Sequence, residues 1–305
     1  MMADLTQVVV AGEDPDTLER TARAVCAQRE AAVQLQIMLP PGLPSAVRQR
    51  AVALADELAQ VVLTEAHERS EGAACNQALS SCQTPWISFL TCGDEVDERF
   101  AAYMLKAGTD QQAEVVVGRS YLRGRTGHVA SDTDAATLLS RHGSRLFILM
   151  HAGSLLFSTA FVRQQKLGFP REVVLRGEQL FLHQVALRVS QVVVELRAAH
   201  IHPLPAVRAF FDHAQVQSII YMAQVISRNL ERNAWQLLDR PEERLGLAWV
   251  YTALLSELRA MADHGGEALD RLTAALLGRE LLRRCPAQTE LQLLLHGPAE
   301  KQPVQ

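Results

Sequence analysis

The stretch Gly72–Asp97 reads GAACNQALSSCQTPWISFLTCGDEVD, and it decides the fold expected for the chain. Small and apolar residues recur at helical spacing in its first half, at Ala74, Ala78 and Cys82. A compact apolar run, Trp86–Leu90, follows and predicts a short buried strand. The stretch is therefore expected to form a helix, a strand and an acidic turn, in that order.

The acidic turn Thr91–Glu95 comes directly after the predicted strand. Open α/β sheets bind their ligands at the carboxyl ends of their strands. Asp94 and Glu95 place two carboxylates at that edge, so both are candidates for handling a metal ion or a phosphate group.

The N-terminal part of the chain predicts a strand, a helix and a second strand. Gln7–Ala11 is a β-branched run that ends at Gly12, and Val33–Leu39 is a second apolar run. Between them, Asp16 or Thr17 is expected to cap a helix. This spacing indicates a right-handed βαβ unit with parallel strands.

The same alternation continues along the chain and predicts an α/β fold, with a mostly parallel sheet flanked by helices. The further elements expected are a helix at Arg48–Ala59, a strand at Val61–Leu63, a helix at Glu98–Leu105 closing on a turn at Gly108–Gln112, a strand at Glu114–Val117 ending at Gly118, a helix at Thr159–Lys166 and a strand at Val192–Leu196.

Composition excludes some classes of protein. A chain of 305 residues with 48% hydrophobic residues can bury a sizeable core, and its net charge of -4 argues against a nonspecific nucleic-acid binder. The five cysteines have no paired metal-ligand spacing, and no secretory signal pattern opens the chain. From these two features we expect a cytoplasmic protein. No apolar run reaches the roughly 20 residues that a membrane-spanning helix needs, so any membrane association is expected to be peripheral.

Three regions are expected. Residues 1–211 form the α/β domain, and residues 212–296 form a helical appendage, because apolar positions recur there at helical spacing. Residues 297–305 are expected to be a disordered tail. The appendage offers apolar faces through which the chain could form a homo-oligomer.

The helix, strand and turn of the opening stretch resemble those of family 2 glycosyltransferases, which have the GT-A fold (Rossmann-like). The counterparts are Asn76 in AACNQAL, Trp86–Leu90 and the turn ending at Asp94. The resemblance covers about the first two thirds of the chain. It implies a nucleotide-sugar donor, Mg²⁺ or Mn²⁺ as the cofactor, and a glycan, a lipid-linked molecule or a protein as the acceptor.

The resemblance also assigns roles at the donor side. Donor-binding residues would be Gly12, Asn76, Asp94, Glu95 and Arg208, and Asp94 would be the metal ligand.

Two acidic motifs of the family pattern lack their acidic residues here. Thr91 and Gly93 stand where the family has metal-binding aspartates, and Pro40 and Pro41 stand where it has an acidic pair at the turn after the second strand. With only Asp94 and Glu95 left in the acidic turn, weak or absent divalent binding is expected.

The resemblance places the general base at Glu178. The segment GFPREVVLRGEQLFL has Glu178 and Gln179 where the family has a Glu-Asp pair after a Phe-Pro turn. A carboxylate at that place would accept the proton of an acceptor hydroxyl. The alternative is that Glu178 is only a favourable charge at a helix N-terminus.

Two further groups of basic residues are candidates for binding an anion. Arg119, Arg123, Arg125 and His128 could meet an anionic acceptor or a pyrophosphate, or they could belong to a solvated loop. His202 and Arg208 are candidates for the donor's pyrophosphate, but spacing fixes no third ligand beside His200 and His202, so no zinc site is predicted.

Two functions remain open from the sequence. The first is an active glycosyltransferase that uses Glu178 as base. The second is a catalytically inactive relative, a pseudoenzyme, that keeps the scaffold to bind sugars or protein partners, which the losses at Pro40–Pro41, Thr91/Gly93 and Gln179 favour.

Overall fold

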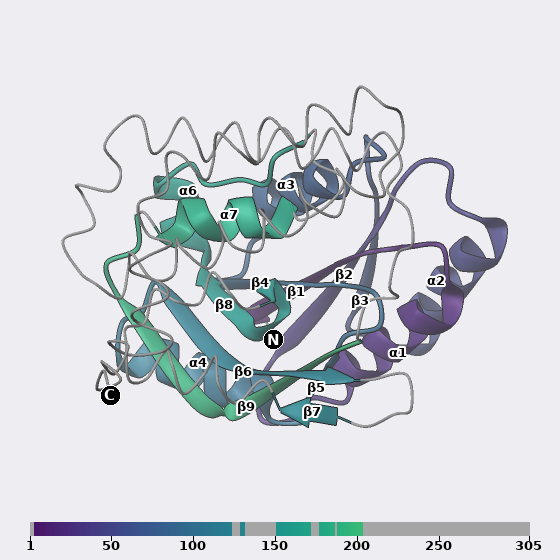
Figure 1. Cartoon of the computed structure of the whole chain (residues 1–305). Coiled ribbons are helices and arrows are strands. Elements are labelled where there is room, and N and C mark those ends of the chain that lie inside the picture. The colour runs from purple at the N-terminus through teal and green to yellow at the C-terminus, as the bar shows by residue number, and fades with distance from the viewer. Residues whose placement is uncertain (1–2, 124–128, 132–150, 172–176, 187, 204–305) are drawn as a thin grey trace, which may run out of the picture. The chain divides into compact units, whose positions relative to one another are not determined.

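The computed structural model describes residues 3–123, 129–131, 151–171, 177–186 and 188–203 (Figure 1). The strands within these residues are β1 Leu5–Val10, β2 Val33–Leu39, β3 Val61–Glu65, β4 Trp86–Leu90, β5 Glu95–Val96, β6 Val115–Arg123, β7 Val129–Ser131, β8 Leu155–Ser158 and β9 Val192–Pro203. The helices are α1 Pro15–Cys26, α2 Ser45–Glu57, α3 Glu71–Ser81, α4 Phe100–Asp110, the 3-10 helix η2 Ala152–Ser154, α6 Thr159–Gln164 and α7 Gly177–Ala186.

All nine strands form one mixed sheet, in the order β3-β2-β1-β4-β8-β6-β9-β5, with β7 paired to β6. The first four are parallel to one another, and β6 is parallel to β9. The pairs that involve β8, β5 or β7 are antiparallel. The predicted α/β class is confirmed, and its parallel part includes the βαβ unit expected at the N-terminus.

The first helix begins two or three residues earlier than the predicted caps imply. Asp14 is the N-cap, and its Oδ1 accepts a hydrogen bond from the backbone N–H of Asp16 (3.0 Å). Pro15 then occupies the first helical position, where its fixed φ and missing N–H cost nothing. The expectation that Asp16 or Thr17 caps this helix is therefore wrong.

One face of the sheet is covered by α1, α2 and α4 (Figure 1). Leu5, Leu18, Leu35, Phe100 and Met104 are fully buried there. Burial of such side chains is the main source of stability, at roughly 1.5–3 kcal/mol for each.

The other face carries α3, α6 and α7 (Figure 1). A cluster of four phenylalanines packs on this face. Phe169 and Phe181 stack with their ring centroids 4.2 Å apart, and Phe89 meets Phe169 edge to face at 4.7 Å. Phe157 lies 5.2 Å from Phe181. This cluster fixes α7, so it also fixes the position of Glu178 in the first turn of that helix.

Two predicted boundaries are wrong for reasons that only packing reveals. The turn expected at Gly108 is the interior of α4, where a Cβ on Gly108 would lie 2.6 Å from the Trp86 ring. The strand expected to end at Gly118 continues to Arg123, after a register shift between Val117 and Arg119. Close packing, and not a turn, requires glycine at position 108.

Several predictions lie outside the described residues. These are Arg125, His128, Arg208, the domain boundary at 211/212, the helical appendage and the tail. The described helices include none that is both long enough and apolar enough to cross a membrane.

Candidate functional site

Asp94 is held in a tight turn directly after β4. Its Oδ2 accepts a hydrogen bond from the Thr91 N–H (2.8 Å), and its own N–H donates to the Thr91 carbonyl (2.9 Å). Gly93 has a φ of +99°, which a residue with a side chain rarely adopts. The turn therefore depends on Gly93, and it directs the Asp94 carboxylate into the protein, where only 1% of the residue is exposed.

The pairing of β5 with β9 brings two histidines to Asp94. Glu95 lies opposite Ile201, and Val96 lies opposite His200, in antiparallel register. One step further along this register, Asp94 faces His202. Because side chains alternate along a strand, His200 and His202 share one face of β9.

Asp94, His200 and His202 form a cluster whose ligand atoms all lie within 4.8 Å of one another. His202 Nδ1 lies 2.6 Å from Oδ1 of Asp94, and His200 Nε2 lies 3.0 Å from Oδ2. Burial alone would raise the pKa of Asp94, but the two imidazoles outweigh it and hold that pKa well below its usual range. The carboxylate is therefore ionised at neutral pH.

One observation indicates that the cluster fits a metal ion. Among the described residues, neither ring nitrogen of the fully buried His200 has a hydrogen-bond partner of good geometry, although buried polar atoms are usually paired. Gly153 packs directly against the cluster, because a Cβ there would lie 2.5 Å from His200 Nε2 and 2.8 Å from Asp94 Oδ2, so a residue with a side chain does not fit at that position.

The ligand chemistry favours transition-metal ions. One carboxylate and two imidazoles suit Mn²⁺ or Zn²⁺ better than Mg²⁺, which prefers oxygen ligands and keeps its waters. The expectation of weak or absent divalent binding counted only the carboxylates of the acidic turn. Asp94 is the residue that could complete the His200–His202 pair as a third ligand.

Glu178 lies close to this cluster and contacts the segment at His151. Its Oε1 lies 3.4 Å from His151 Nδ1, and its Oε2 accepts a hydrogen bond from the Ala152 N–H (3.3 Å). Burial would raise the pKa of Glu178, but these two contacts lower it below its usual value. The side chain as a whole keeps 26% of its surface exposed.

Two residues of the site, His151 and Glu71, were not predicted from the sequence. The His151 ring stacks on His202 with centroids 3.8 Å apart. A histidine within the apolar run 146–157 was the available signal. Glu71 lies in the first turn of α3, and lost hydration of its carboxylate together with the charges of Glu178 and Asp94 raises its pKa. No spacing rule connects it to the site.

Of the predicted donor-binding residues, Asn76 has an evident structural role. Its Nδ2 donates to the Phe169 carbonyl (2.8 Å), and its Oδ1 accepts from the Phe169 N–H (2.8 Å). These bonds tie α3 to the segment before α7. Gly12 lies opposite Cys92: a Cβ built on Gly12 would be 4.0 Å from the Cβ and Sγ atoms of Cys92. Gly12 therefore borders the turn that holds Asp94.

Glu95 is engaged on its own side of the sheet. Both of its oxygens meet the guanidinium of Arg123, with one N–O distance of 2.9 Å, and Arg20 lies 3.7 Å away. Arg119 comes within 3.4 Å of the Tyr121 hydroxyl. The structure thus brings Asp94 and Glu178 together and leaves Glu95 in an ion pair.

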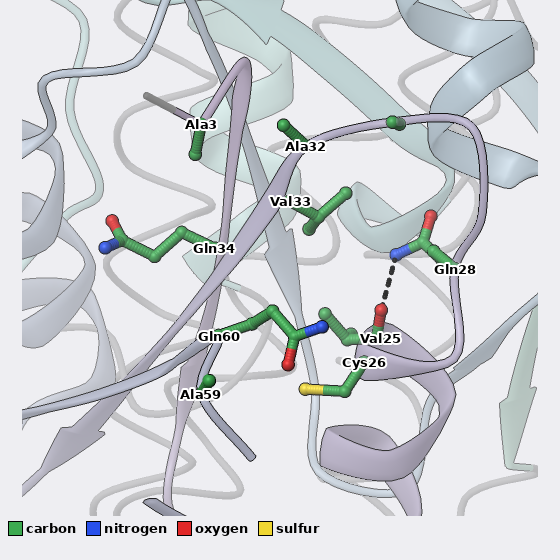
Figure 2. Close-up of a pocket in the computed structure, with 10 residues that line it drawn as sticks. Ala3, Val25, Cys26, Gln28, Ala32, Val33, Gln34, Ala59 and Gln60 are labelled. Carbon is green, nitrogen blue, oxygen red and sulfur yellow. Dashed lines mark hydrogen bonds between the residues drawn. The ribbon is translucent and has the colours of Figure 1, made fainter. Parts of the chain in front are cut away.

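A cavity of about 350 Å³ lies at the opposite edge of the sheet, near the amino ends of β2 and β3 (Figure 2). Figure 2 shows Gln28, Gln34 and Gln60 around it, with Gln28 Nε2 donating to the Val25 carbonyl (3.3 Å). Among the described residues that line it, Cys26 is the one titratable group, and burial raises the pKa of that thiol to about 11. These described residues do not supply the charged groups that acid-base or metal chemistry needs.

No protein-family model and no curated protein matches the chain. Solved structures do match it. The S. aureus protein TarS, residues 1–349 in complex with UDP-GlcNAc, is 13% identical with a TM-score of 0.59, over 94% of this chain and 92% of that chain. The mannosyltransferase PcManGT from Pyrobaculum calidifontis, in complex with GDP-Man and Mn²⁺, is 14% identical with a TM-score of 0.56, over 97% and 85%. The chain therefore has the GT-A-like fold of these proteins.

Proposed function

We propose that the chain is a glycosyltransferase of the family 2 type, which transfers a sugar from a nucleotide-sugar donor to an acceptor hydroxyl. One observation carries the proposal. The Asp94–His200–His202 cluster and the Glu178 carboxylate lie together beyond the carboxyl end of β4, in a fold shared with solved glycosyltransferase structures. The neighbours' ligands, UDP-GlcNAc and GDP-Man, make nucleoside diphosphate sugars the donor class to test first.

On the donor side, Asp94, His200 and His202 would hold a divalent cation. When bound, such an ion neutralises the charge of the donor's diphosphate and of the leaving nucleoside diphosphate. The protein contributes a preformed set of metal-binding side chains. The Thr91–Asp94 turn and the β5–β9 pairing hold these side chains in place before a cation or a donor binds. Gly12 and Arg208 stay proposed donor contacts.

On the acceptor side, Glu178 would take the proton of the acceptor hydroxyl. The acceptor oxygen then bonds to the anomeric carbon while the bond from that carbon to the diphosphate oxygen breaks. The lowered pKa keeps Glu178 ionised and ready to accept a proton at neutral pH. This is a single displacement, so it predicts inversion at the anomeric carbon.

The catalytic part is tested by replacing Glu178. Glu178→Gln keeps the side-chain volume and removes the base, so transfer should fall by roughly 10²–10⁴-fold while donor affinity and melting temperature change little. Mass spectrometry of products and chromatography of released nucleoside diphosphate measure transfer across a panel of donors and acceptors. Glu98→Gln is the matched control, because Glu98 is an exposed residue paired with Arg29.

A second variant resolves which carboxylate acts. If Glu71→Gln removes transfer and Glu178→Gln does not, Glu71 is the base. Its raised pKa makes it the better proton acceptor of the two once ionised. Equal activity of both variants and the wild type would contradict a carboxylate base at this site.

The metal part is tested by calorimetry with Mn²⁺. The wild type should bind one ion with a micromolar Kd, and Asp94→Asn should weaken binding by at least about 10-fold. Asp110→Asn is the control, since Asp110 pairs only with Lys106 on an exposed helix turn among the contacts described. Absence of Mn²⁺ binding by the wild type would remove the proposed donor-side chemistry.

The second candidate function is a pseudoenzyme that binds a nucleotide sugar or a partner without transfer. The observation that favours it is the Pro40–Pro41 pair after β2, whose side chains can accept no hydrogen bond from a base or ribose. Donor binding in a thermal-shift screen, without transfer to any acceptor or to water, would support this function over the first.

A further inference from the structure

His151 lies between the two parts of the site and contacts both. Its backbone is fixed, because its carbonyl accepts hydrogen bonds from the Ser154 N–H (2.9 Å) and the Ser154 hydroxyl (2.7 Å). Ser154 itself is fully buried. The imidazole is thus carried by the N-cap residue of η2, whose backbone is held by Ser154.

The first contact of the imidazole is with Glu178. His151 Nδ1 lies 3.4 Å from Oε1, while the next residue, Ala152, donates its N–H to Oε2 at 3.3 Å. Residues 151 and 152 therefore hold both oxygens of the carboxylate from one short segment. A carboxylate held at both oxygens loses the rotation that would take it out of line with an acceptor hydroxyl.

The second contact is with His202. The two rings stack with centroids 3.8 Å apart and planes inclined by 22°. His202 Nδ1 is the atom that lies 2.6 Å from Asp94 Oδ1. A ring packed flat against another restricts its rotation about χ2, so His151 limits the directions in which His202 can present Nδ1.

The exposed fraction of the side chains increases from the proposed metal ligands toward His151 and Glu178. The side chains of Asp94 and His200 are 1% and 0% exposed, His202 is 12% exposed, and His151 and Glu178 are 27% and 26% exposed. His151 therefore lies at the boundary between the buried ligands and the open side of the site.

We propose that His151 is a positioning residue with two separable roles, which rests on the function proposed above. Its Nδ1 orients Glu178 for the acceptor, and its ring face orients His202 for the cation. Neither role requires His151 to touch the sugar or the metal ion.

Three variants separate the roles. His151→Ala removes both contacts. His151→Phe keeps a flat ring against His202 and removes the donor to Glu178. His151→Asn places an amide nitrogen near the former Nδ1 and removes the ring.

Two readouts are measured for each variant. The first is Mn²⁺ affinity by calorimetry without donor, which does not depend on activity. The second is kcat and KM for transfer at saturating Mn²⁺. Melting curves accompany both, and His67→Ala, at an exposed histidine, is the control for Mn²⁺ affinity.

We expect the Phe and Asn variants each to restore a different one of the two properties. His151→Ala should weaken Mn²⁺ binding and lower kcat, each by about 10-fold, the lower end of the effect typical of residues that orient a metal ligand. His151→Phe should recover most of the metal affinity and keep the low kcat. His151→Asn should recover most of kcat and keep the weak metal affinity, and KM for the donor should change less than kcat.

The two proposals fail in different ways. If the wild type binds Mn²⁺ and transfers sugar, and the Phe and Asn variants do not differ in the predicted directions, the role of His151 is overturned and the glycosyltransferase function stands. If the wild type binds Mn²⁺ but transfers no sugar, the proposed role of His151 in orienting Glu178 is wrong. A wild type that does neither overturns both proposals. If His151→Ala melts below the assay temperature, the two roles are still tested by comparing Mn²⁺ affinity and kcat between His151→Phe and His151→Asn.

Discussion

Gly153 lies against His200 so closely that a Cβ at position 153 would be 2.5 Å from the Nε2 atom. Both neighbours of that Cβ, His200 and Asp94, are buried and cannot move aside freely. A residue with a side chain at this position would therefore have to displace the proposed metal ligands.

Gly153→Ala should therefore damage the metal site more than the fold. We expect Mn²⁺ affinity to fall by about 10-fold or more, and overpacking to cost about 1–3 kcal/mol of stability. Calorimetry and denaturant unfolding measure the two effects. Gly12→Ala is the matched control, because a Cβ there meets its nearest neighbour at 4.0 Å. Unchanged Mn²⁺ affinity in Gly153→Ala would contradict a cation between Asp94 and His200.

Gly93→Asp should not create a stronger metal site, although the family pattern places an aspartate there. The φ of +99° and a Cβ contact of 3.0 Å with Pro203 both oppose a side chain. We expect a stability loss of about 1–3 kcal/mol, measured by denaturant unfolding.

Thr91→Asp is the comparison at the same turn. Thr91 is exposed, so the substitution should be tolerated within about 0.5 kcal/mol. A Gly93→Asp protein with wild-type stability and tighter Mn²⁺ binding would show that the turn relaxes more easily than its contacts suggest.

Asn76→Ala should act on stability and leave donor affinity unchanged. The substitution removes both hydrogen bonds to Phe169 and leaves the partly buried backbone groups of that residue without these partners. The expected loss is about 1–3 kcal/mol by denaturant unfolding. Donor affinity is measured well below the melting temperature, with the exposed Gln83→Ala as control. A selective loss of donor affinity would instead support Asn76 as a donor contact.

The stability of the protein should decrease at alkaline pH through two partly buried cysteines, Cys92 and Cys26. Burial raises the pKa of Cys92 to about 12 and that of Cys26 to about 11, whereas an unfolded cysteine has a pKa of about 8.5. Because the unfolded state loses these protons first, each thiol's contribution is complete below about pH 8.5 and is lost as pH rises toward the folded pKa. Melting temperature should fall between pH 8 and 9.5, and less steeply in Cys92→Ala. Parallel pH curves for the two proteins would argue against this origin.

Local pattern predicted the regular elements well. The second strand has the predicted bounds, Val33–Leu39, and the strand Trp86–Leu90 follows a helix that ends at Ser81. These elements are set by apolar periodicity within a few residues, which the sequence displays directly.

The errors came from interactions that periodicity does not record. Gly108 has the composition of a turn, but it is retained inside α4 because the Trp86 ring leaves no room for a Cβ. Gly118 likewise lies within β6, where a Cβ would come within 3.0 Å of the Ala198 carbonyl oxygen. In both cases the cause is a neighbour far away in the sequence.

The candidate site was predictable only in part, for the same reason. Asp94 and Glu178 could be chosen from motifs, whereas the partner of Asp94 is His202, 108 residues away. The i, i+2 spacing of His200 and His202 showed one face of a strand, but the identity of the third ligand depends on how β5 pairs with β9. Glu95 was chosen for its place in the acidic turn, and the ion pair with Arg123 lies on the opposite face.

The position of β9 also has a consequence for when the site forms during folding. Among the described strands, β9 lies between β6 and β5, and β5 has no other neighbour. Asp94 leaves the ribosome long before His200 and His202, and the ligand set is complete only after β9 has inserted at that place. Such long-range pairing is slow to form, so the cation cannot act as a nucleus for folding. It would instead bind the finished sheet and, by mass action, slow the loss of β9 from it.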